Sequence, residues 1–218
     1  MAFALLTHGS GPSDGSSNNA VTGSIDTTGA ALLIVVVSWS AGVTLAVSDS
    51  KSNTWHGMTA QASGSAQTRI YWCVPTTVGT GHTFTAATTG GAPGIDAASF
   101  SGSVTATPND QENGAHSDAA TTLATGSITP SATGALVIAA LGSNSTGSYS
   151  IDSGFTIADQ RTFAPGQFGG ALAYIIETTI VSKNPTWTQG SSTFTAAAIA
   201  SFSFTAAATS SGGMFQVF

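Results

Sequence analysis

Residues 30–37 read AALLIVVV, and a related stretch, ALVIAALG, spans 135–142. A membrane-spanning helix needs about 20 apolar residues, so neither run is long enough and we expect no membrane insertion. Each run has the ordinary length of a strand, at about 3.3 Å per residue. An unbroken apolar run of this length is typical of a strand that is buried on both faces. Both stretches are therefore predicted to be buried strands.

These two runs belong to a longer internal repeat. Five other segments recur in the same order, each about 103 positions from its copy, a spacing typical of duplicated domains or half-domains. We interpret the chain as a duplicated unit covering 22–102 and 125–204. The other matched segments are TGSI (22–25 and 125–128), VSDS and SIDS (47–50 and 150–153), Tyr71 and Tyr174, TFT and TWT (83–85 and 186–188), and ASFS (98–101 and 200–203).

The chain is predicted to be all-β. Short runs of Thr, Val, Ile and aromatic residues alternate with Gly, Ser, Asn and Asp, which is the pattern of strands joined by turns. We expect a jelly-roll-like β-sandwich built from two pseudo-repeated halves, forming one compact body over 1–218. One interlocked sandwich and two tandem sandwiches both remain open. Strands in the first half are expected at 20–26, 31–39, 43–48, 54–60, 68–75, 82–88 and 95–101.

Two segments lie outside the repeat. Residues 103–124 are polar and are predicted to cross the surface as a long connection between the halves. Residues 205–218 are predicted to be a flexible tail that ends in the apolar pentapeptide MFQVF. The pentapeptide either packs back as a last strand or docks into a neighbour by strand addition. The expected assembly contacts are Met214, Phe215, Val217 and Phe218.

Charged residues are rare, and this limits the partners that we expect. Only 6% of residues are charged, the net charge is −6, and there are four Lys and Arg residues in total. A basic patch cannot form, so we expect no binding to nucleic acid or to anionic membranes. A hydroxyl-rich surface of this kind is common on extracellular and virion proteins. No signal peptide is predicted in MAFALLTHGS, which favours a phage virion because phages leave the cell by lysis.

The order of motifs resembles a broad family of roughly 200-residue β-sandwich segments found in bacterial surface proteins and in phage structural and tail proteins. The resemblance rests on VSDSKSNTW, RIYWCV, IDAASFSG, an Asn-Asp-Gln element and FTAAAIASFSF, and covers about 22–204. It implies a structural or adhesive role more than an enzymatic one. The family has no established catalytic residues to transfer to this chain.

Several patterns that could support catalysis have simpler interpretations. GPSDG at 11–15 matches G-x-S-x-G, but no helix is predicted after it to hold a nucleophilic serine. Asp110, Glu112 and Asp118 could act as general acid and base, although a solvated connecting loop is the preferred interpretation. The histidines lack zinc-binding spacing, and Cys73 is predicted to be a buried, unpaired thiol. We therefore expect no enzyme, catalytic residue, metal or cofactor.

Some residues have specific predicted places. Asp49 and Asp152 occupy equivalent positions and are predicted to cap turns through their own backbones. Alternation in ASFS predicts equivalent buried sites for Phe100 and Phe202. Trp187 is also predicted to pack in the core, because its counterpart in the repeat is a phenylalanine.

Trp55 and His56 are the predicted contacts for a glycan, because Trp55 stands at a loop-to-strand boundary. The first hypothesis for the whole chain is a non-enzymatic phage virion protein, in a capsid decoration, minor capsid, tail or fibre role. Its expected partners are copies of itself and other virion proteins. The alternative is an extracellular glycan-binding module or adhesin, and a hydrolase using the carboxylates of 110–118 is a third hypothesis.

Overall fold

The computed structural model describes residues 2–12 and 18–204. Strands make up 58% of the structure, they pair in antiparallel sheets, and the described residues contain no helix. The predicted all-β sandwich is confirmed. The predicted assembly contacts Met214, Phe215, Val217 and Phe218 lie outside the described residues. The rest of the tail 205–218 and Ser13 of GPSDG also lie outside them.

The first half builds one large sheet and one small sheet. The large sheet has the order β1-β9-β3-β7-β5, with β6 also paired to β7, and the small sheet has the order β2-β8-β4. Its strands are β1 (Ala4–Gly11), β2 (Asn19–Val21), β3 (Leu32–Ser40), β4 (Leu45–Asp49), β5 (His56–Gly57), β6 (Gln61–Ala62), β7 (Ala66–Cys73), β8 (Phe84–Thr88) and β9 (Gly94–Ser101).

The second half repeats this arrangement with fewer, longer strands. Its sheet has the order β10-β15-β11-β14-β13, and β12 pairs with the first part of β15. Two long strands, β10 and β15, are each equivalent to two consecutive strands of the jelly-roll order in the first half. The strands are β10 (Asn109–Ala124), β11 (Leu136–Ser143), β12 (Tyr149–Ile151), β13 (Thr156–Arg161), β14 (Gly169–Ile176) and β15 (Thr186–Phe202).

Each half has a jelly-roll-like strand order. When β5 and β6 are counted as one strand, the first half has eight strands in chain order. Strands 1, 8, 3 and 6 are then neighbours in the large sheet, with strand 5 beside strand 6, and strands 2, 7 and 4 form the small sheet. The same order describes the second half, where β10 supplies strands 1 and 2 and β15 supplies strands 7 and 8. The register of β10 shifts between Ser117 and Ala120, and such irregularities bend a strand from one sheet layer into the next.

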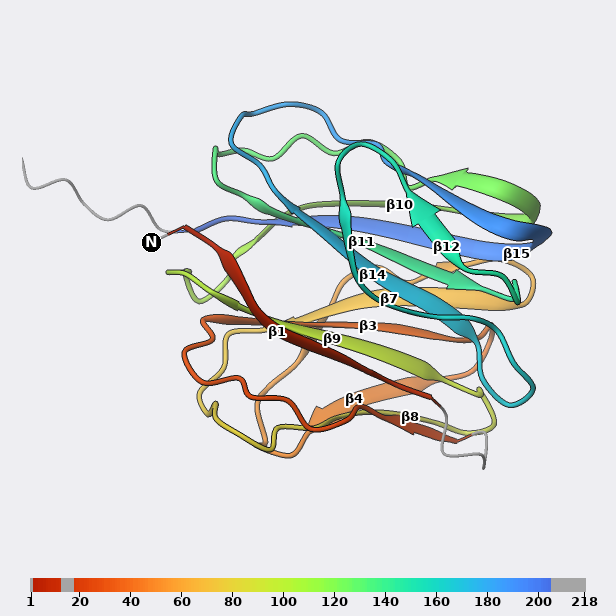
Figure 1. Cartoon of the computed structure of the whole chain (residues 1–218), viewed down its shortest axis with the longest axis horizontal. Coiled ribbons are helices and arrows are strands. Elements are labelled where there is room, and N and C mark those ends of the chain that lie inside the picture. Colours follow the sequence, from red (N-terminus) through yellow and green to blue (C-terminus); the bar gives the residue numbers. More distant parts are fainter. Residues whose placement is uncertain (1, 13–17, 205–218) are drawn as a thin grey trace, which may run out of the picture.

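The two halves stack face to face through their large sheets (Figure 1). In the stack β3 lies over β11, β9 over β14 and β7 over β15. Exchanging the halves maps the pair β3 and β11 onto itself and exchanges the other two pairs, as in the isologous interface of a symmetric dimer. Each half is thus a sandwich of its own, and a shared central core joins the two.

This stacking explains the two apolar runs of the sequence, at 30–37 and 135–142. Leu32, Ile34 and Val36 face the central core, while Leu33 and Val35 face the core within the first half. The run of β11 divides in the same way between the central core and the core of the second half. A strand that is buried on both faces has no polar side to show, so the predicted buried strands are confirmed.

Phe100 and Phe202 occupy equivalent buried sites, as predicted. Both are fully buried in the central core. Phe100 lies opposite Leu32, and Phe202 lies opposite Leu136, which opens the matching strand of the second half. Trp187 is also buried as predicted, in the core of the second half.

The prediction that 103–124 is a polar connection is wrong for most of its length. Residues 109–124 form β10, the longest strand but one, which pairs with β15. The strand escaped the sequence pattern because it lies at the edge of its sheet, where polar side chains face solvent. Two of its three carboxylates bond loops of the first half: Glu112 accepts from the N–H of Thr59 at 2.8 Å, and Asp118 from the N–H of Gly64 at 2.7 Å.

Candidate functional site

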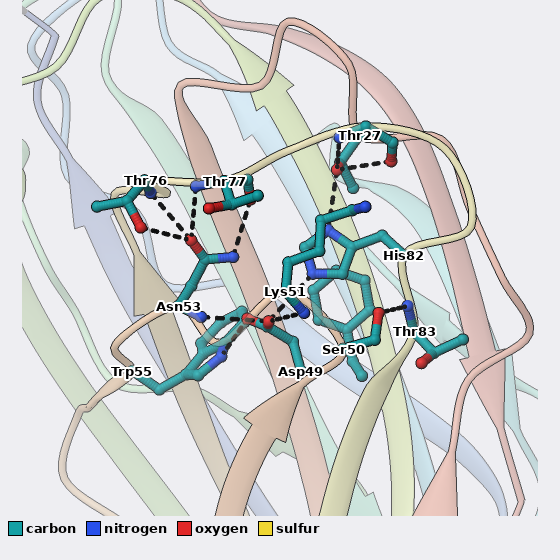
Figure 2. Close-up of polar contacts among 12 residues, drawn as sticks. Thr27, Asp49, Ser50, Lys51, Asn53, Trp55, Thr76, Thr77, His82 and Thr83 are labelled. Carbon is teal, nitrogen blue, oxygen red and sulfur yellow. Dashed lines mark hydrogen bonds and ion pairs between the residues drawn. The ribbon is translucent and has the colours of Figure 1, made fainter.

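The densest polar cluster among the described side chains lies where β4 ends, in the first half (Figure 2). Asp49 is the last residue of β4, and its side chain is fully buried. Its Oδ1 accepts hydrogen bonds from the backbone N–H groups of Lys51 (2.7 Å) and Asn53 (3.3 Å), and its Oδ2 accepts one from Nε1 of Trp55 (2.9 Å). The prediction that Asp49 caps a turn is therefore confirmed.

Asp152 occupies the equivalent place in the second half, but among the described residues its carboxylate accepts no backbone N–H of its own turn, so the prediction that it caps a turn through its own backbone is wrong. Its Oδ1 accepts the backbone N–H of Thr186 at 2.7 Å and the hydroxyl of Ser153 at 2.8 Å. Asp49, by contrast, also orients an indole ring and faces a histidine. The polar cluster around Asp49 is therefore a feature of the first half that has no counterpart around Asp152 in the described part of the chain.

His82 lies beneath this turn, and its ring is fully buried. Nε2 of His82 stands 3.4 Å from Oδ1 of Asp49, without a hydrogen bond of good geometry. Nδ1 is 2.9 Å from the hydroxyl of Thr27, and the ring stacks on Phe84 with the centroids 4.4 Å apart. Asp49, His82 and Thr27 therefore form a buried row of a carboxylate, an imidazole and a hydroxyl.

The surrounding bonds indicate which nitrogen of His82 carries the proton. The hydroxyl of Thr27 has two acceptors within reach, Gly79 O at 3.2 Å and Nδ1 of His82 at 2.9 Å. Gly79 O already accepts the backbone N–H of Thr27 at 3.1 Å, so the Thr27 hydroxyl is best oriented to donate to Nδ1. Nε2 then carries the ring proton and lies 3.4 Å from Oδ1 of Asp49. We assign the neutral Nε2–H tautomer from this network.

Burial and hydrogen bonding act on the two titratable groups in opposite ways. Burial is the largest influence on the pKa of His82 and lowers it, and the negative charge of Asp49 opposes this shift without reversing it. Burial alone would raise the pKa of Asp49, but the donors of Lys51, Asn53 and Trp55 outweigh it and hold that pKa below its usual value. The stable form of the pair is a neutral imidazole beside an ionised carboxylate.

Asn53 extends the cluster to a second loop. Its Oδ1 accepts the backbone N–H groups of Thr76 (2.9 Å) and Thr77 (3.0 Å), and its Nδ2 donates to Thr77 O at 3.0 Å. One buried amide therefore replaces the hydrogen bonds that the loop backbone would otherwise make to water. With Asp49 and His82, it ties the segments 26–30, 49–55 and 76–83 into one block.

The row of Asp49, His82 and Thr27 has the residue types of a hydrolytic relay, but its geometry supports a structural role. The Thr27 side chain is fully buried, and its oxygen accepts the N–H of Gly79 at 3.1 Å. An attacking hydroxyl has to reach a substrate atom about 3 Å away, which a group enclosed by its own backbone does not do. We interpret the cluster as a lock that fixes three loops.

The carboxylates proposed for acid–base chemistry face different loops. Asp110 accepts the N–H of Ser131 at 2.8 Å, while Glu112 and Asp118 bond Thr59 and Gly64 of the first half. Of the three, only Glu112 lines the open hollow of about 240 Å³ at this edge of the molecule. The structure therefore does not gather the trio around one site. The hollow is lined by Thr59, Gln61, Glu112, Asn113 and Gly114.

The two predicted glycan contacts differ in what they expose. The Trp55 ring is half-buried, packs edge-to-face on Phe84 at 5.8 Å, and donates its N–H to Asp49. His56 is exposed and stacks on Trp72, with the centroids 4.4 Å apart. The structure thus places Trp55 in the polar cluster and leaves His56 as the accessible ring of the pair.

The remaining features considered in the sequence are a reactive cysteine, a metal site and a membrane-spanning segment. Burial, with a smaller contribution from Asp49, raises the pKa of the Cys73 thiol to about 12, which suits an inert core residue. No three His, Cys, Asp or Glu side chains of the described residues lie close enough to hold a metal ion. The same part of the chain has no helix that is long and apolar enough to cross a membrane.

Sequence reasoning missed the partners of Asp49 and a second buried pair. Thr27, Asn53 and His82 carried no recognisable pattern, since the hydrogen bonds of their side chains reach across 23 to 55 positions of sequence. Asp96 and Arg161 form a buried ion pair between the halves and lie in unrelated segments. A usable signal was the rarity of charge, because an Asp inside an apolar strand such as IDAASFSG needs a buried partner.

Comparison with protein-family models, curated proteins and solved structures found no match to this chain.

Proposed function

We propose that this chain is a non-enzymatic structural protein of a bacteriophage virion, acting as a capsid decoration, minor capsid, tail or fibre component. It works by assembling with copies of itself and with other virion proteins. The resemblance of its motifs to phage structural and bacterial surface segments supports this role. The chain also pairs its few charged side chains internally, which favours the same role.

Every charged side chain in the described residues has a partner within the chain. The carboxylates accept bonds from backbone, hydroxyl, indole or cationic groups, and the Lys and Arg side chains donate to carbonyls or carboxylates. The set comprises Asp26, Asp49, Asp96, Asp110, Glu112, Asp118, Asp152, Asp159, Glu177, Lys51, Arg69, Arg161 and Lys183.

This use of charge favours extensive protein–protein contact. Covering a free charge at an interface costs several kcal/mol unless a partner is supplied, and the centres of interfaces are depleted in charged residues. A surface of hydroxyls, amides and small apolar groups can be covered without that penalty. A rigid body whose charges are already paired is thus suited to tight packing in an assembly.

Two measurements test the proposal. Light scattering after size exclusion is expected to show oligomers of defined mass, and mass spectrometry of purified virions from the source phage is expected to detect the chain at a fixed copy number. A chain that is monomeric at all concentrations and missing from the particles would contradict the proposal.

A glycan-binding module remains the second candidate, and the hollow beside β10 favours it. Its lining offers hydroxyl, amide and carboxylate groups from Thr59, Gln61, Asn113 and Glu112, which are the groups that bond sugar hydroxyls. A glycan array with the wild type, Trp55→Ala and Gln61→Ala separates the two proposed contact areas. An array without any signal would remove this candidate.

A further inference from the structure

Two loops occupy equivalent places in the two halves. Residues 74–83 connect β7 to β8, and residues 177–185 connect β14 to β15. An antiparallel bridge closes each loop, Ile25 with His82 in the first half and Ile128 with Lys183 in the second. The loops also share a short motif, TTV in the first and TTI in the second. Because the loops are equivalent, side chains that differ between them show a property that only one half has.

The polar cluster holds the first loop, whereas the second loop presents apolar side chains. Asn53, Thr27 and His82 fix the first loop, and Val78 is half-buried. The second loop is pinned at its base, where Lys183 pairs with the buried Glu177 at 2.6 Å. Beyond that pair, Ile180 is 54% exposed and its neighbour Val181 is 42% exposed.

Ile180 and Val181 form what we name the apolar knob. The large hydrophobic side chains that stand exposed among the described residues are these two, Leu6 and Val21, and the knob holds the two that are adjacent in sequence. Covering both aliphatic side chains would remove their apolar area from water, which is favourable. The knob is therefore an exposed apolar contact site on the described surface.

The described chain ends beside this loop. The ring of Phe204 covers Gly134 so closely that a Cβ on that glycine would collide with it. The N–H of Gly134 in turn donates to Glu177 O at 2.5 Å, at the base of the loop that carries the knob. Residues 205–218, with MFQVF at their end, thus continue from a point near the knob.

We propose that the knob binds the C-terminal segment Met214–Phe218 of a second copy of the chain. Residues 205–213 can span about 30 Å when fully extended, which is long enough to reach the knob of a neighbouring copy. The chain's own tail is the competing occupant, and the oligomeric state measured below separates the two. A tail and a knob at different sites of one chain make a heterologous contact, which closes into a ring or continues as a filament.

This inference rests on the assembly function proposed above, and names the contact through which copies join. The test uses a chain that ends at Gly213, which keeps every residue of the described core, since Phe204 is the last described residue packed against it. A fluorescein-labelled GGMFQVF peptide is titrated into this shortened chain and followed by fluorescence anisotropy. Ile180→Ser with Val181→Ser is expected to weaken binding at least about tenfold. Leu6→Ser with Val21→Ser, the matched control, is expected to leave it unchanged.

Light scattering then distinguishes a second copy from other occupants. The full chain is expected to be oligomeric, and both the shortened chain and the double-serine knob variant are expected to be monomeric. A flat peptide titration, or peptide binding with a full chain that stays monomeric, overturns the inference. Oligomers that persist without the tail also overturn the inference but leave the assembly function standing. Conversely, tail-dependent oligomers of a chain that is missing from virions would support the contact between tail and knob and contradict the virion function.

Discussion

Asp96 on β9 and Arg161 on β13 form a buried, bidentate ion pair across the junction between the two halves. Nε of Arg161 lies 3.1 Å from Oδ1 of Asp96, and Nη2 lies 2.8 Å from Oδ2. The guanidinium passes close over Gly94, where a Cβ would collide with it, and its Nη1 also donates to Phe168 O at 3.3 Å. The pair fixes the register in which the halves stack.

Removing one partner of this pair should destabilise the whole protein. Asp96→Asn leaves a buried guanidinium without its counter-charge, so we expect the free energy of unfolding to fall by about 3–5 kcal/mol. Urea denaturation followed by tryptophan fluorescence measures this loss. Asp159→Asn is the control, because it breaks the more exposed pair with His8 at the same junction and should cost about 0–1 kcal/mol. Equal losses in the two variants would contradict this account.

Acid should weaken the fold through His82. Because burial lowers its pKa in the folded state, the unfolded chain binds a proton more readily, and stability should be complete above about pH 6.5 and fall below it. The lowered pKa of Asp49 adds a second loss at pH values below about 4. Unfolding free energies measured between pH 4.5 and 8 should therefore decline more steeply for the wild type than for His82→Gln. His56→Gln is the matched control at an exposed histidine, and a wild-type slope matching that of His82→Gln would argue against this prediction.

Gly142 should be intolerant of a side chain. A Cβ at this position in β11 would stand 2.6 Å from Gln67 O of the other half, against a backbone that cannot move aside. Gly142→Ala is expected to cost about 1–3 kcal/mol of unfolding free energy. At Gly23 an added Cβ meets nothing within 4 Å, so Gly23→Ala should be neutral or slightly stabilising. Thermal melts of the two variants side by side provide the check.

Phe100 and Phe202 should respond alike to truncation. Each is fully buried in the central core at matching positions, so Phe100→Ala and Phe202→Ala should each cost about 3–5 kcal/mol. Similar losses in both variants are expected from the pseudo-symmetric junction. If one variant lost less than about 1 kcal/mol, the two sites would not be energetically equivalent.

Local pattern was sufficient for the doubly buried strands and for the cap at Asp49. The runs at 30–37 and 135–142 predicted doubly buried strands, because a strand without a polar face can only lie between two layers. Alternation in ASFS placed Phe100 and Phe202 inside, and the Asp-Ser pairs identified the turn at Asp49. These features depend on neighbours a few positions away, which the order of residues shows directly.

Tertiary structure alone decided how the layers stack and which polar groups meet. The strand β10 looked like a polar connection, since two of its three carboxylates find their partners in loops some 50 positions away. Asp96 meets Arg161, and His82 meets Thr27, across separations of 65 and 55 positions. Pairings of this kind cost loop-closure entropy and desolvation that only the assembled core offsets, so they leave no periodic trace in the sequence.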